Sequence, residues 1–517
     1  MNDKQLMPYP SLALLTDLYQ LTMAYGYWKT GVAQKEAVFH LFFRENPFQG
    51  GFAMACGLSY AMDFIENFHF DPTDIDYLAS LRGSDQKPLF EKAFLSSLKE
   101  MKFQCDVDAM PEGTVVFAFE PLIRVQGPLL QCQLLETILL NILNFQTLIA
   151  TKAARVCLAA KGDSVLEFGL RRAQGMAGAV AASRAAYIGG CHATSNVLAG
   201  KMFGIPVKGT QAHSWIMSFD DELEAFQAYA KALPNNCIFL VDTYDTLQGV
   251  KKAVEVGKWL RQQGHEMLGV RLDSGDLASL SVAARKILDE AGFTKAKIIG
   301  SNELDEYAIE DLKNRGAKID IWGVGTKLMT AYDQPALGGV YKLTAVRTTD
   351  EEWKYKIKLS EQAIKVSNPG IQQVRRFSAE GMALADMIYD VRTSLTGDCP
   401  TGLSPRGLQK SLSRSFGMKI NKGDYEIIDL QEENKQTKIL AGTAFTDLLV
   451  PVFRRGKQVY TPPPTVHDIR QYAQTNLARF KPELKRLANP VRHPVGLEKS
   501  LSLLKTDLIR RTKEPTP

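Results

Sequence analysis

Short runs of apolar residues alternate with longer amphipathic stretches between about residues 163 and 345. A polar turn follows each run, and the spacing of apolar positions predicts helices at about 220–233, 247–263, 277–292 and 304–315. The runs are SVLEFG (164–169), IPVKG (205–209), CIFLVD (237–242), EMLGVRLD (266–273), AKIIGSN (296–302) and KIDIWGVG (318–325). Apolar strands separated by helices indicate a parallel sheet that helices cover.

The number of runs favours a barrel. With GGCHATS (189–195) and GGVYKLTAV (338–346) added, this part of the chain supplies about seven or eight strands, which is enough for a (β/α) barrel. A doubly wound open sheet remains the alternative at this point.

The flanking parts of the chain have mixed patterns. Residues 12–30 and 133–160 are expected to be helices and 36–44 a strand, while 114–130 resembles two strands broken at Pro121. We therefore expect an α/β protein in four parts: a mixed α+β N-terminal domain (1–150), a catalytic barrel (151–345), a β-rich segment that completes the N-terminal domain (346–450) and a helical C-terminal extension (451–517).

Composition narrows the class of protein. A chain of 517 residues exceeds one ordinary core, and 45% hydrophobic with 23% charged residues is typical of globular proteins. The net charge of +5 is not gathered into a basic tract, so no nucleic-acid surface is expected. Seven cysteines without a CxxC spacing predict reduced thiols and no zinc site. Neither a secretion signal nor an apolar run of about 18–20 residues is apparent, so we expect a cytoplasmic protein without membrane contact.

Polar clusters recur where the predicted strands end. Glu167 with Arg171 and Arg172 follows one run, and Thr210 with His213 follows another. Four further clusters are DTYDT (242–246), RLDSGD (271–276), SNELDE (301–306) and GVGTK (323–327). Each alone has a structural explanation, such as a turn for DSGD or a helix cap for Asn302. Their recurrence at corresponding strand ends favours a ligand site, since a parallel barrel binds ligands there.

The residue types in these clusters suit a sugar-phosphate transfer. GVGTK offers backbone amides and a hydroxyl for a phosphate, and SNELDE offers a helix start. Arginine side chains bind carboxylates or phosphates through paired N–H donors, and the chain has Arg171, Arg172 and Arg271 at strand ends. Carboxylates that could bind Mg²⁺ or stabilise a positive reaction centre are Asp242, Asp245, Asp273 and Asp276. Glycoside hydrolysis is less favoured, because it would leave the phosphate positions without a purpose.

A series of ordered motifs resembles the nicotinate phosphoribosyltransferase family. The motifs are LLTDLYQLTMAYGYW (14–28), LEFGLRRAQG (166–175), SNVLAG (195–200), GTQAHS (209–214), GVRLDSGDL (269–277), SNELDE (301–306), GVGTKL (323–328) and GGVYKL (338–343). The resemblance implies a mixed N-terminal domain with an irregular barrel of the type II phosphoribosyltransferase kind. It also implies transfer of a phosphoribosyl group from 5-phosphoribosyl 1-pyrophosphate to nicotinate, ATP as co-substrate, Mg²⁺ or alternatively Mn²⁺, and a homodimer with shared active sites.

The resemblance also implies roles for individual residues. His213 would be phosphorylated by ATP, and Asp273 would lie near the ribosyl carbon and its Mg²⁺, with Glu167 as a further catalytic residue. Nicotinate would be bound by Tyr19, Thr210, Arg271 and Arg171, with Tyr19 stacking on the ring from the partner subunit. The phosphoribosyl donor would be held by Gly323, Gly325, Thr326, Ser301 and Asn302.

Some alternatives stay open. His192 in GGCHATSN is a second histidine near a strand, but the GTxAHS pattern favours His213. Nicotinamide phosphoribosyltransferase, quinolinate phosphoribosyltransferase and a catalytically inactive metabolite-binding relative are the competing functional hypotheses.

Overall fold

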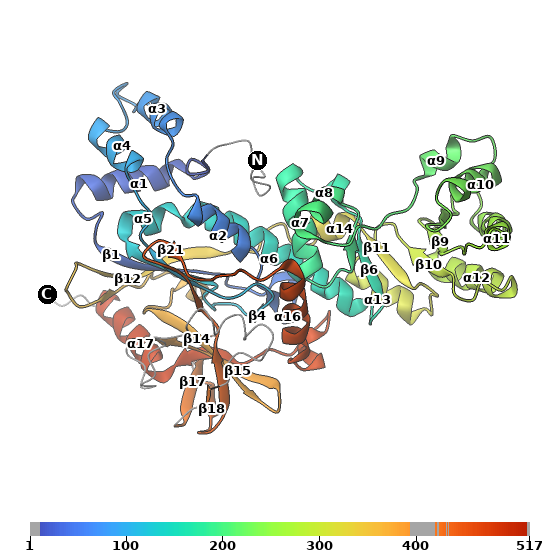
Figure 1. Ribbon diagram of the computed structural model, residues 1–517. Coiled ribbons are helices and arrows are strands. Elements are labelled where there is room, and N and C mark those ends of the chain that lie inside the picture. Colours follow the sequence, from blue (N-terminus) through green and yellow to red (C-terminus); the bar gives the residue numbers. More distant parts are fainter. Residues whose placement is uncertain (1–10, 393–418, 421–422, 431, 433, 514–517) are drawn as a thin grey trace. The chain divides into compact units, whose positions relative to one another are not determined.

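The chain folds into two compact units, and the computed structural model describes residues 11–392, 419–420, 423–430, 432 and 434–513 (Figure 1). The first unit is built from Ile149–Pro335. The second unit combines Gln5–Leu148 with Ala336–Pro517, so the two outer parts of the chain fold together. The boundary lies inside the long helix α6 (Glu136–Ala159).

A six-stranded parallel sheet forms the centre of the first unit. Its strands are β6 (Ser164–Glu167), β7 (Ala193–Thr194), β8 (Ile238–Leu240), β9 (Gly269–Leu272), β10 (Lys297–Gly300) and β11 (Ile321–Val324), in the order β7-β6-β11-β10-β9-β8. Each strand from β8 to β11 adjoins the next one along the chain, and β11 then pairs with β6. A doubly wound sheet would instead reverse its order at a switch point. The expected irregular barrel is therefore confirmed, as a half-barrel.

Two of the expected barrel strands differ from the sequence prediction. The run 205–209 forms only one bridge, in which Val207 pairs with Thr194 beside β7. The run 338–346 is a strand, β12 (Val340–Arg347), but it lies in the second unit and pairs antiparallel with β1 (Glu36–Phe42). An apolar run predicts that a strand forms, and it does not predict which distant strand will be its partner.

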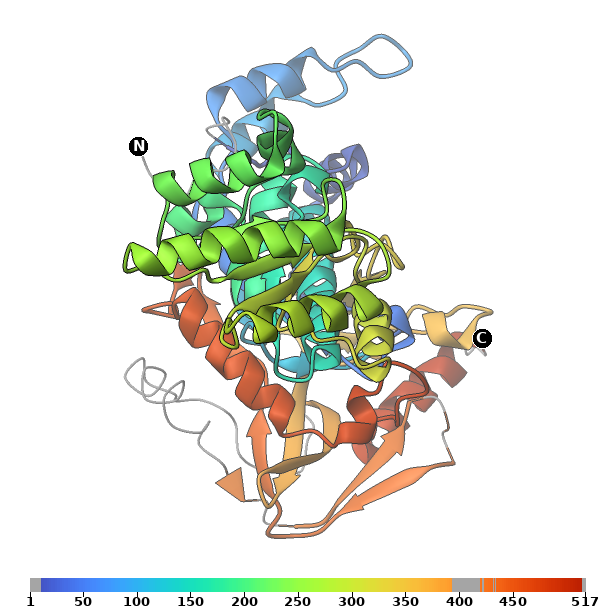
Figure 2. The same ribbon diagram turned by 90° about the vertical axis from the view of Figure 1, so that its right-hand side faces the viewer.

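Helices connect the strands of the first unit, as the apolar spacing predicts. They are α7 (Met176–Ile188), α8 (Val197–Phe203), α9 (His213–Met217), α10 (Glu222–Ala232), α11 (Thr246–Gln262), α12 (Leu277–Glu290), α13 (Glu306–Asn314) and α14 (Thr326–Met329). Asp221 and Asp245 accept hydrogen bonds from backbone N–H groups where α10 and α11 begin. The helices α10, α11 and α12 lie side by side (Figure 2). The carboxyl ends of the strands therefore lead into loops and helix starts that can present side chains.

The second unit contains two seven-stranded sheets. The first has the order β13-β12-β1-β5-β3-β20-β21 and adds β3 (Asp106–Ala109), β5 (Ile123–Pro128), β13 (Lys354–Tyr355), β20 (Val450–Arg454) and β21 (Lys457–Gln458). Strands from residues 340–458 thus complete a sheet begun in the first 130 residues, and of these strands only β13 lies wholly within the segment 346–450 that the sequence analysis gives this role. A short pair is formed by β2 (Ala53–Met54) and β4 (Val115–Val116).

The other sheet of this unit has the order β16-β19-β14-β15-β22-β17-β18. Its strands are β14 (Gln372–Ala379), β15 (Met382–Asp390), β16 (Lys419–Ile420), β17 (Tyr425–Asp429), β18 (Gln436–Ile439), β19 (Ala444–Asp447) and β22 (Val495–Glu498). Residues 451–517, expected as a helical extension, contain the helices α16 (Val466–Ala478) and α17 (Lys499–Lys513) together with β22, which lies between β15 and β17. This segment is therefore a structural part of the unit.

The remaining helices of the second unit precede α6 along the chain. They are α1 (Leu18–Lys29), α2 (Leu58–Glu66), α3 (Pro72–Ser80), α4 (Lys92–Lys99) and α5 (Leu129–Leu134). Among the residues that the structure describes, no helix has the length and hydropathy needed to cross a bilayer. Six cysteines lie in this described part and all are free, while Cys399 lies outside it.

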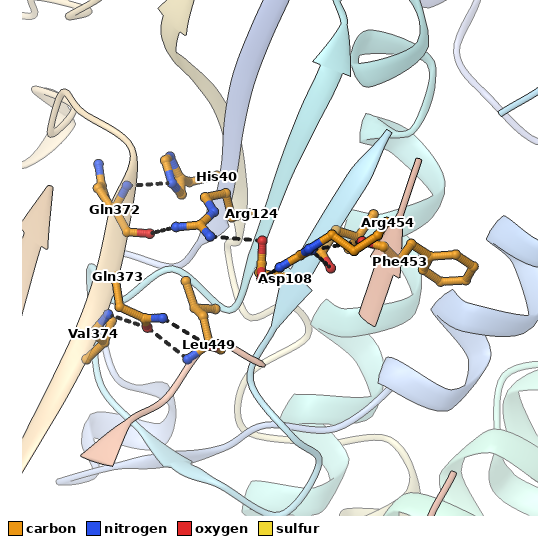
Figure 3. A network of polar contacts seen from close by, with 10 residues as sticks. His40, Asp108, Arg124, Gln372, Gln373, Val374, Leu449, Phe453 and Arg454 are labelled. Carbon is orange, nitrogen blue, oxygen red and sulfur yellow. Dashed lines mark hydrogen bonds and ion pairs between the residues drawn. The ribbon is translucent and has the colours of Figure 1, made fainter. Parts of the chain in front are cut away.

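A buried polar network connects the two large sheets of the second unit (Figure 3). Arg124 on β5 donates to Asp108 on β3 and to the Gln372 carbonyl on β14, each at 2.9 Å. The Gln372 N–H donates to Nε2 of His40 on β1 at 3.1 Å, and Arg454 pairs with Asp108 at 2.5 Å. Burial and the charge of Arg124 hold the pKa of His40 well below its usual range. His40 is therefore neutral and accepts the hydrogen bond.

A buried ionic cluster lies beside β14 and β15. Arg376 donates from Nε to both oxygens of Asp386, at 2.9 and 3.1 Å, and Nε2 of His493 lies 3.4 Å from the same carboxylate. Burial and the nearby negative charge of Asp386 raise the pKa of Glu120 well above its usual range. Burial alone would raise the pKa of Asp386, but Arg376 and His493 outweigh it and lower that pKa. Glu120 is therefore the protonated member of the carboxyl pair.

Substituting these two carboxyl groups should have unequal effects on stability. We expect Asp386→Asn to destabilise the fold by about 3–5 kcal/mol, because Arg376 keeps a buried charge without its partner. Glu120→Gln should cost less than about 1 kcal/mol, since an amide replaces an acid that is already neutral. Urea unfolding followed by tryptophan fluorescence at pH 7 measures both.

The pH dependence provides the control for this prediction. A raised folded-state pKa makes wild-type stability fall as pH rises from the unfolded value of about 4.3 toward the folded value. Glu120→Gln lacks this loss, so the variant should gain stability relative to the wild type between pH 5 and pH 8. Equal destabilisation by both substitutions at pH 7 would contradict the protonation of Glu120.

Candidate active site

His213 and Asp242 form a pair at the carboxyl end of the half-barrel. His213 is the first residue of α9, and Asp242 comes two residues after β8. Nε2 of His213 lies 3.3 Å from Oδ1 of Asp242, whose side chain is fully buried, whereas the His213 side chain is 40% exposed. The other carboxylate oxygen accepts from the Asp273 N–H at 3.0 Å and from the Ser274 hydroxyl at 2.5 Å. Asp242 is thus fixed and can orient the imidazole.

Arg271 on β9 joins three further residues that the sequence predicts for the site. Its guanidinium donates to the Ser301 hydroxyl at 2.8 Å, to the Thr210 hydroxyl at 3.1 Å and to the Asp273 carboxylate at 2.8 Å. Ser301 in turn donates to Asp273 at 2.5 Å. A guanidinium has five N–H groups, and three have these partners, so two remain for a ligand. Two parallel N–H donors match a carboxylate.

Asp273 connects the two groups of residues. Its N–H binds Asp242, the partner of His213, while its carboxylate binds Arg271. Hydrogen bonds therefore join Thr210, Arg271, Asp273 and Ser301 to Asp242, and the 3.3 Å contact with Asp242 adds His213 to this network. The sequence interpretation missed one role, because Asp242 was considered as a possible Mg²⁺ ligand or as a stabiliser of a positive reaction centre, and not as the partner of His213. The signal that could have found it is its place at the end of the apolar run 237–242, as Asp273 stands at the end of the run 266–273.

Glu167 and its neighbours form a separate part of the site at the end of β6. The Glu167 carboxylate is fully buried and accepts from the Gly169 N–H at 2.5 Å, from Ser183 at 2.9 Å and from Thr194 at 2.5 Å. Burial raises the pKa of Glu167 although these hydrogen bonds oppose the shift. The hydrogen bond from the Gly169 N–H to the Glu167 carboxylate fixes the conformation of the turn at Gly169.

Arg171 follows that turn and, unlike the buried Glu167, is exposed to solvent. Arg171 and Arg172 are exposed, and neither side chain makes a hydrogen bond or ion pair within the described ranges of the chain. Both guanidinium groups are therefore available to an anionic ligand.

The glycine turn after β11 is closely packed. Gly325 precedes α14, and Thr326 is the exposed first residue of that helix. A Cβ on Gly169 would lie 2.1 Å from Cγ of Met329 and 2.7 Å from the Gly325 carbonyl oxygen, and one on Gly323 would lie 2.7 Å from the Phe168 ring. Only glycine allows this approach. The Thr326 hydroxyl makes no hydrogen bond to the described part of the protein.

The turn after β10 is conformationally unusual. Asn302 has φ of 101°, a left-handed value that side chains other than glycine rarely adopt. The Leu304 N–H donates to the Asn302 carbonyl at 2.5 Å within this turn. Ser301 immediately precedes it and belongs to the Arg271 network, so the two residues predicted to bind the donor lie at the edge of the site.

A cavity of about 720 Å³ lies inside the half-barrel. Leu166, Phe168, His192, Thr210 and Ile299 line it, together with residues before β9 and β10 such as Met267 and Phe293. Of the network around Arg271, only Thr210 reaches this cavity. This volume is in the range of small-molecule sites. The His192 ring accepts from the Val165 N–H through Nδ1 at 3.2 Å, which is a structural contact.

The carboxylates considered for Mg²⁺ have different partners. Asp245 caps α11, and Asp276 pairs with Arg315 at 2.6 Å. Within the ranges that the structure describes, no three His, Cys, Asp or Glu side chains form a metal cluster. Mg²⁺ commonly binds through one or two carboxylates with substrate phosphates supplying other ligands. Asp273, at the centre of the site, fits that mode.

Tyr19 belongs to the second unit and is not part of this network. It lies on α1 and is 48% exposed, and its exposed apolar neighbours on the same stretch are Leu15, Leu18 and Met23. Burial and the carboxylates of Glu136 and Asp17 raise the pKa of Tyr19, so the phenol is neutral.

Sequence models of one family match three consecutive parts of the chain. The model described as the nicotinate phosphoribosyltransferase N-terminal domain matches residues 14–144. The model of the nicotinate phosphoribosyltransferase family matches residues 164–370, and that of the C-terminal domain matches 371–505.

Individual relatives are similar over nearly the whole chain. A nicotinate phosphoribosyltransferase of Bacillus subtilis (strain 168) is 42% identical over 511 residues, covering 97% of this chain and 96% of the relative. The Homo sapiens protein of that name is 33% identical over 552 residues, covering 96% of each. The crystal structure of human nicotinic acid phosphoribosyltransferase has a TM-score of 0.77 at 31% identity, covering 95% of this chain and 99% of that one. Nicotinate-nucleotide pyrophosphorylase from Pyrococcus furiosus shares the fold, with a TM-score of 0.66 at 21% identity, covering 92% and 98%.

Proposed function

Because the chain belongs to the nicotinate phosphoribosyltransferase family, we propose that it joins nicotinate to 5-phosphoribosyl 1-pyrophosphate. The products are nicotinate mononucleotide and pyrophosphate, and the reaction is the first step that brings nicotinate into NAD biosynthesis. ATP hydrolysis to ADP and phosphate is coupled to it, as in a ligase. The observation that carries this proposal is the single network linking His213 through Asp242 and Asp273 to Arg271.

Arg271 and Thr210 bind the nicotinate in this proposal. The two remaining N–H groups of Arg271 receive the carboxylate, and the Thr210 hydroxyl is already held at 3.1 Å from the guanidinium. Arg171 adds positive charge to the pocket, and Tyr19 stacks on the pyridine ring. A neutral amide would gain less from Arg271 than an acid does.

The phosphoribosyl donor binds between the turns that follow β10 and β11. Gly323, Gly325 and Thr326 hold the 5-phosphate with Ser301 and Asn302 beside them, because backbone N–H groups and free hydroxyls suit phosphate oxygens. Mg²⁺, or Mn²⁺ in its place, would be held by Asp273 and would neutralise charge on the departing pyrophosphate. The ring nitrogen forms a bond to the ribosyl carbon as the bond from that carbon to pyrophosphate breaks. Glu167 keeps the Gly169 turn in place beneath Arg171 and the glycine turn.

His213 is the proposed site of phosphorylation. With Nε2 of His213 facing the Asp242 carboxylate at 3.3 Å, the lone pair of Nδ1 can attack the γ-phosphorus of ATP, so that an N–P bond forms and ADP leaves. Water then attacks the phosphohistidine, which releases phosphate and restores the imidazole. Phosphorylation can drive the transfer only if it changes the affinity for donor and product unequally.

The working enzyme in this proposal is a cytoplasmic homodimer with shared sites. The exposed apolar side chains on and beside α1, which include Tyr19, support a second copy of the chain as their cover. Tyr19 then completes the nicotinate site of the partner.

An assay of product formation tests the proposed function directly. Nicotinate, the donor, Mg²⁺ and ATP should together give nicotinate mononucleotide, with a higher yield than without ATP, in gel-filtration fractions of the dimer. Nicotinamide and quinolinate in place of nicotinate serve as matched substrates. Faster reaction with nicotinamide would favour the amide-specific function, and no product with any of the three would favour an inactive metabolite-binding relative.

A further inference from the structure

A buried ion cluster joins acidic residues that follow the two turns assigned to the donor along the chain. Lys152 on α6 is fully buried, and its Nζ lies 2.7 Å from Oε2 of Glu306, the equally buried first residue of α13. The same Nζ pairs with the carboxylate of Asp333, which follows α14. Arg155, one turn further along α6, donates to the other oxygen of Glu306 at 2.8 Å. Lys152 thus links the start of α13, which follows β10, to Asp333, which lies in the segment that follows β11.

A second ion pair connects the same two segments. Lys327, the second residue of α14, donates to Oδ2 of Asp305 at 2.6 Å. Asp305 also accepts from the Ala308 N–H at 2.7 Å, which caps α13. Burial would raise the pKa of Asp305, but the hydrogen bonds from Lys327 and Ala308 outweigh it and hold that pKa below its usual range. Asp305 is therefore ionised, and the segment from Lys327 to Asp333 is tied to the start of α13 at two points.

Strained backbone lies inside both of the tied segments. Asn302 has φ of 101° just before Asp305, and the buried Ala331 has φ of 45° between Lys327 and Asp333. Left-handed conformations at residues other than glycine persist where the surrounding structure overdetermines them, and they gather at functional sites. The ion pairs of Lys327 and Asp333 supply that constraint on the segment directly after the Gly325–Thr326 turn.

Stability alone does not account for such a cluster. Buried ion pairs are often no more stabilising than apolar residues of similar volume, because desolvation offsets their attraction. They do fix the distance and orientation of the groups that carry them. In this fold the fixed distance is that between the turn at Ser301–Asn302 and the turn at Gly325–Thr326.

We propose that Lys152 is a positioning residue which, through Glu306 and Asp333, sets the spacing of the two turns that hold the 5-phosphate of the phosphoribosyl donor. This inference rests on the proposed function for the identity of the ligand. It assigns Lys152, Glu306 and Asp333 no contact with the substrate. Their effect should appear in donor binding, and not in nicotinate binding or in histidine phosphorylation.

Two variants test the proposal in the full-length protein. Lys152→Met removes the central charge, and Asp333→Asn removes the tie to α14 while Glu306 keeps both Lys152 and Arg155. Asp333 is 38% exposed, so its variant is expected to fold even if Lys152→Met does not. Each variant should raise the KM for the donor about tenfold, with kcat and the KM for nicotinate changed less than threefold. Matched controls are Lys286→Met and Asp311→Asn, which remove exposed ion pairs on α12 and α13.

Ribose 5-phosphate and pyrophosphate distinguish positioning from general damage. Inhibition by ribose 5-phosphate should weaken about tenfold in Asp333→Asn, while inhibition by pyrophosphate should stay within threefold of the wild type. A folded Asp333→Asn protein with an unchanged donor KM and unchanged ribose 5-phosphate inhibition overturns the proposal. An equal loss in all kinetic constants also overturns it, since it indicates a purely structural role.

Calorimetry separates this proposal from the proposed function. Wild-type protein that forms no mononucleotide but binds ribose 5-phosphate, with binding weakened in Asp333→Asn, would refute the function and support the positioning role. Wild-type protein that does not bind ribose 5-phosphate would refute the positioning role.

Discussion

The His213→Ala variant should incorporate no phosphate from γ-labelled ATP and should lose all stimulation of the transfer by ATP. A slow transfer without ATP should remain, because the variant keeps Arg271, Asp273 and the glycine turn that would bind the substrates. The reason is that alanine has no nitrogen to form the N–P bond, whereas the reaction at the ribosyl carbon depends on positioning and electrostatics. Acid-labile labelling of the protein and rates with and without ATP are the measurements.

Two further variants make this prediction specific. Asp242→Asn keeps the imidazole but removes its charged partner at 3.3 Å, so labelling should persist at a rate lower by roughly 10²-fold. His192→Ala serves as the control, because that ring accepts a hydrogen bond from the Val165 N–H and is expected to leave labelling unchanged. Unchanged labelling in His213→Ala would remove His213 from the mechanism.

Most of the half-barrel could be predicted from the sequence, and for a physical reason. Strands of a parallel sheet are buried on both faces, so they occur as continuous apolar runs, and helices must connect them. The runs at 164–169, 237–242, 266–273, 296–302 and 318–325 correspond to β6, β8, β9, β10 and β11. The residues after these strands are close in space because parallel strands end at the same edge. That property predicts that Arg271, Asp273 and Ser301 lie close together, whereas Thr210 and His213 follow the single bridge at Val207 and reach them through Arg271 and Asp242.

The parts that could not be predicted depend on contacts between distant segments. The run at 338–346 has the same apolar character as a barrel strand, yet it pairs with β1, some 300 residues earlier. The insertion of β22 between β15 and β17 has the same origin. The periodicity of apolar residues within one segment indicates a strand, but it does not indicate which distant strand will pair with it.

Lys152 and Glu306 were overlooked for a related reason. In the sequence they are charged residues on expected helices, where solvent exposure is the usual outcome. Only the packing of α6 against the start of α13 buries them together at 2.7 Å. Buried charges of this kind therefore require a structure before they can be recognised as part of a site.

Arg271→Met should lower kcat/KM for nicotinate by about 10²–10³-fold, the largest effect we expect on substrate binding. Methionine keeps much of the side-chain volume but removes the two N–H groups proposed for the carboxylate and the three that hold Thr210, Ser301 and Asp273. The loss of these three bonds disturbs the site for any substrate. The loss of the carboxylate contact affects only the acid, so activity with nicotinamide should fall at least tenfold less.

The ratio of the activities with nicotinate and with nicotinamide therefore decides the role of Arg271. Arg347→Met is the matched control, because each arginine pairs with one carboxylate and lies over an aromatic ring. Arg347 pairs with Glu36 at 2.6 Å and lies over Trp353, as Arg271 pairs with Asp273 and lies over Phe168. It lies in the second unit, outside the site, and its loss should change neither rate by more than about twofold. If nicotinate and nicotinamide lose activity in equal proportion in Arg271→Met, the guanidinium organises the site without binding the carboxylate. In that case the exposed Arg171 becomes the partner of the acid, and Arg171→Met should then change the ratio instead.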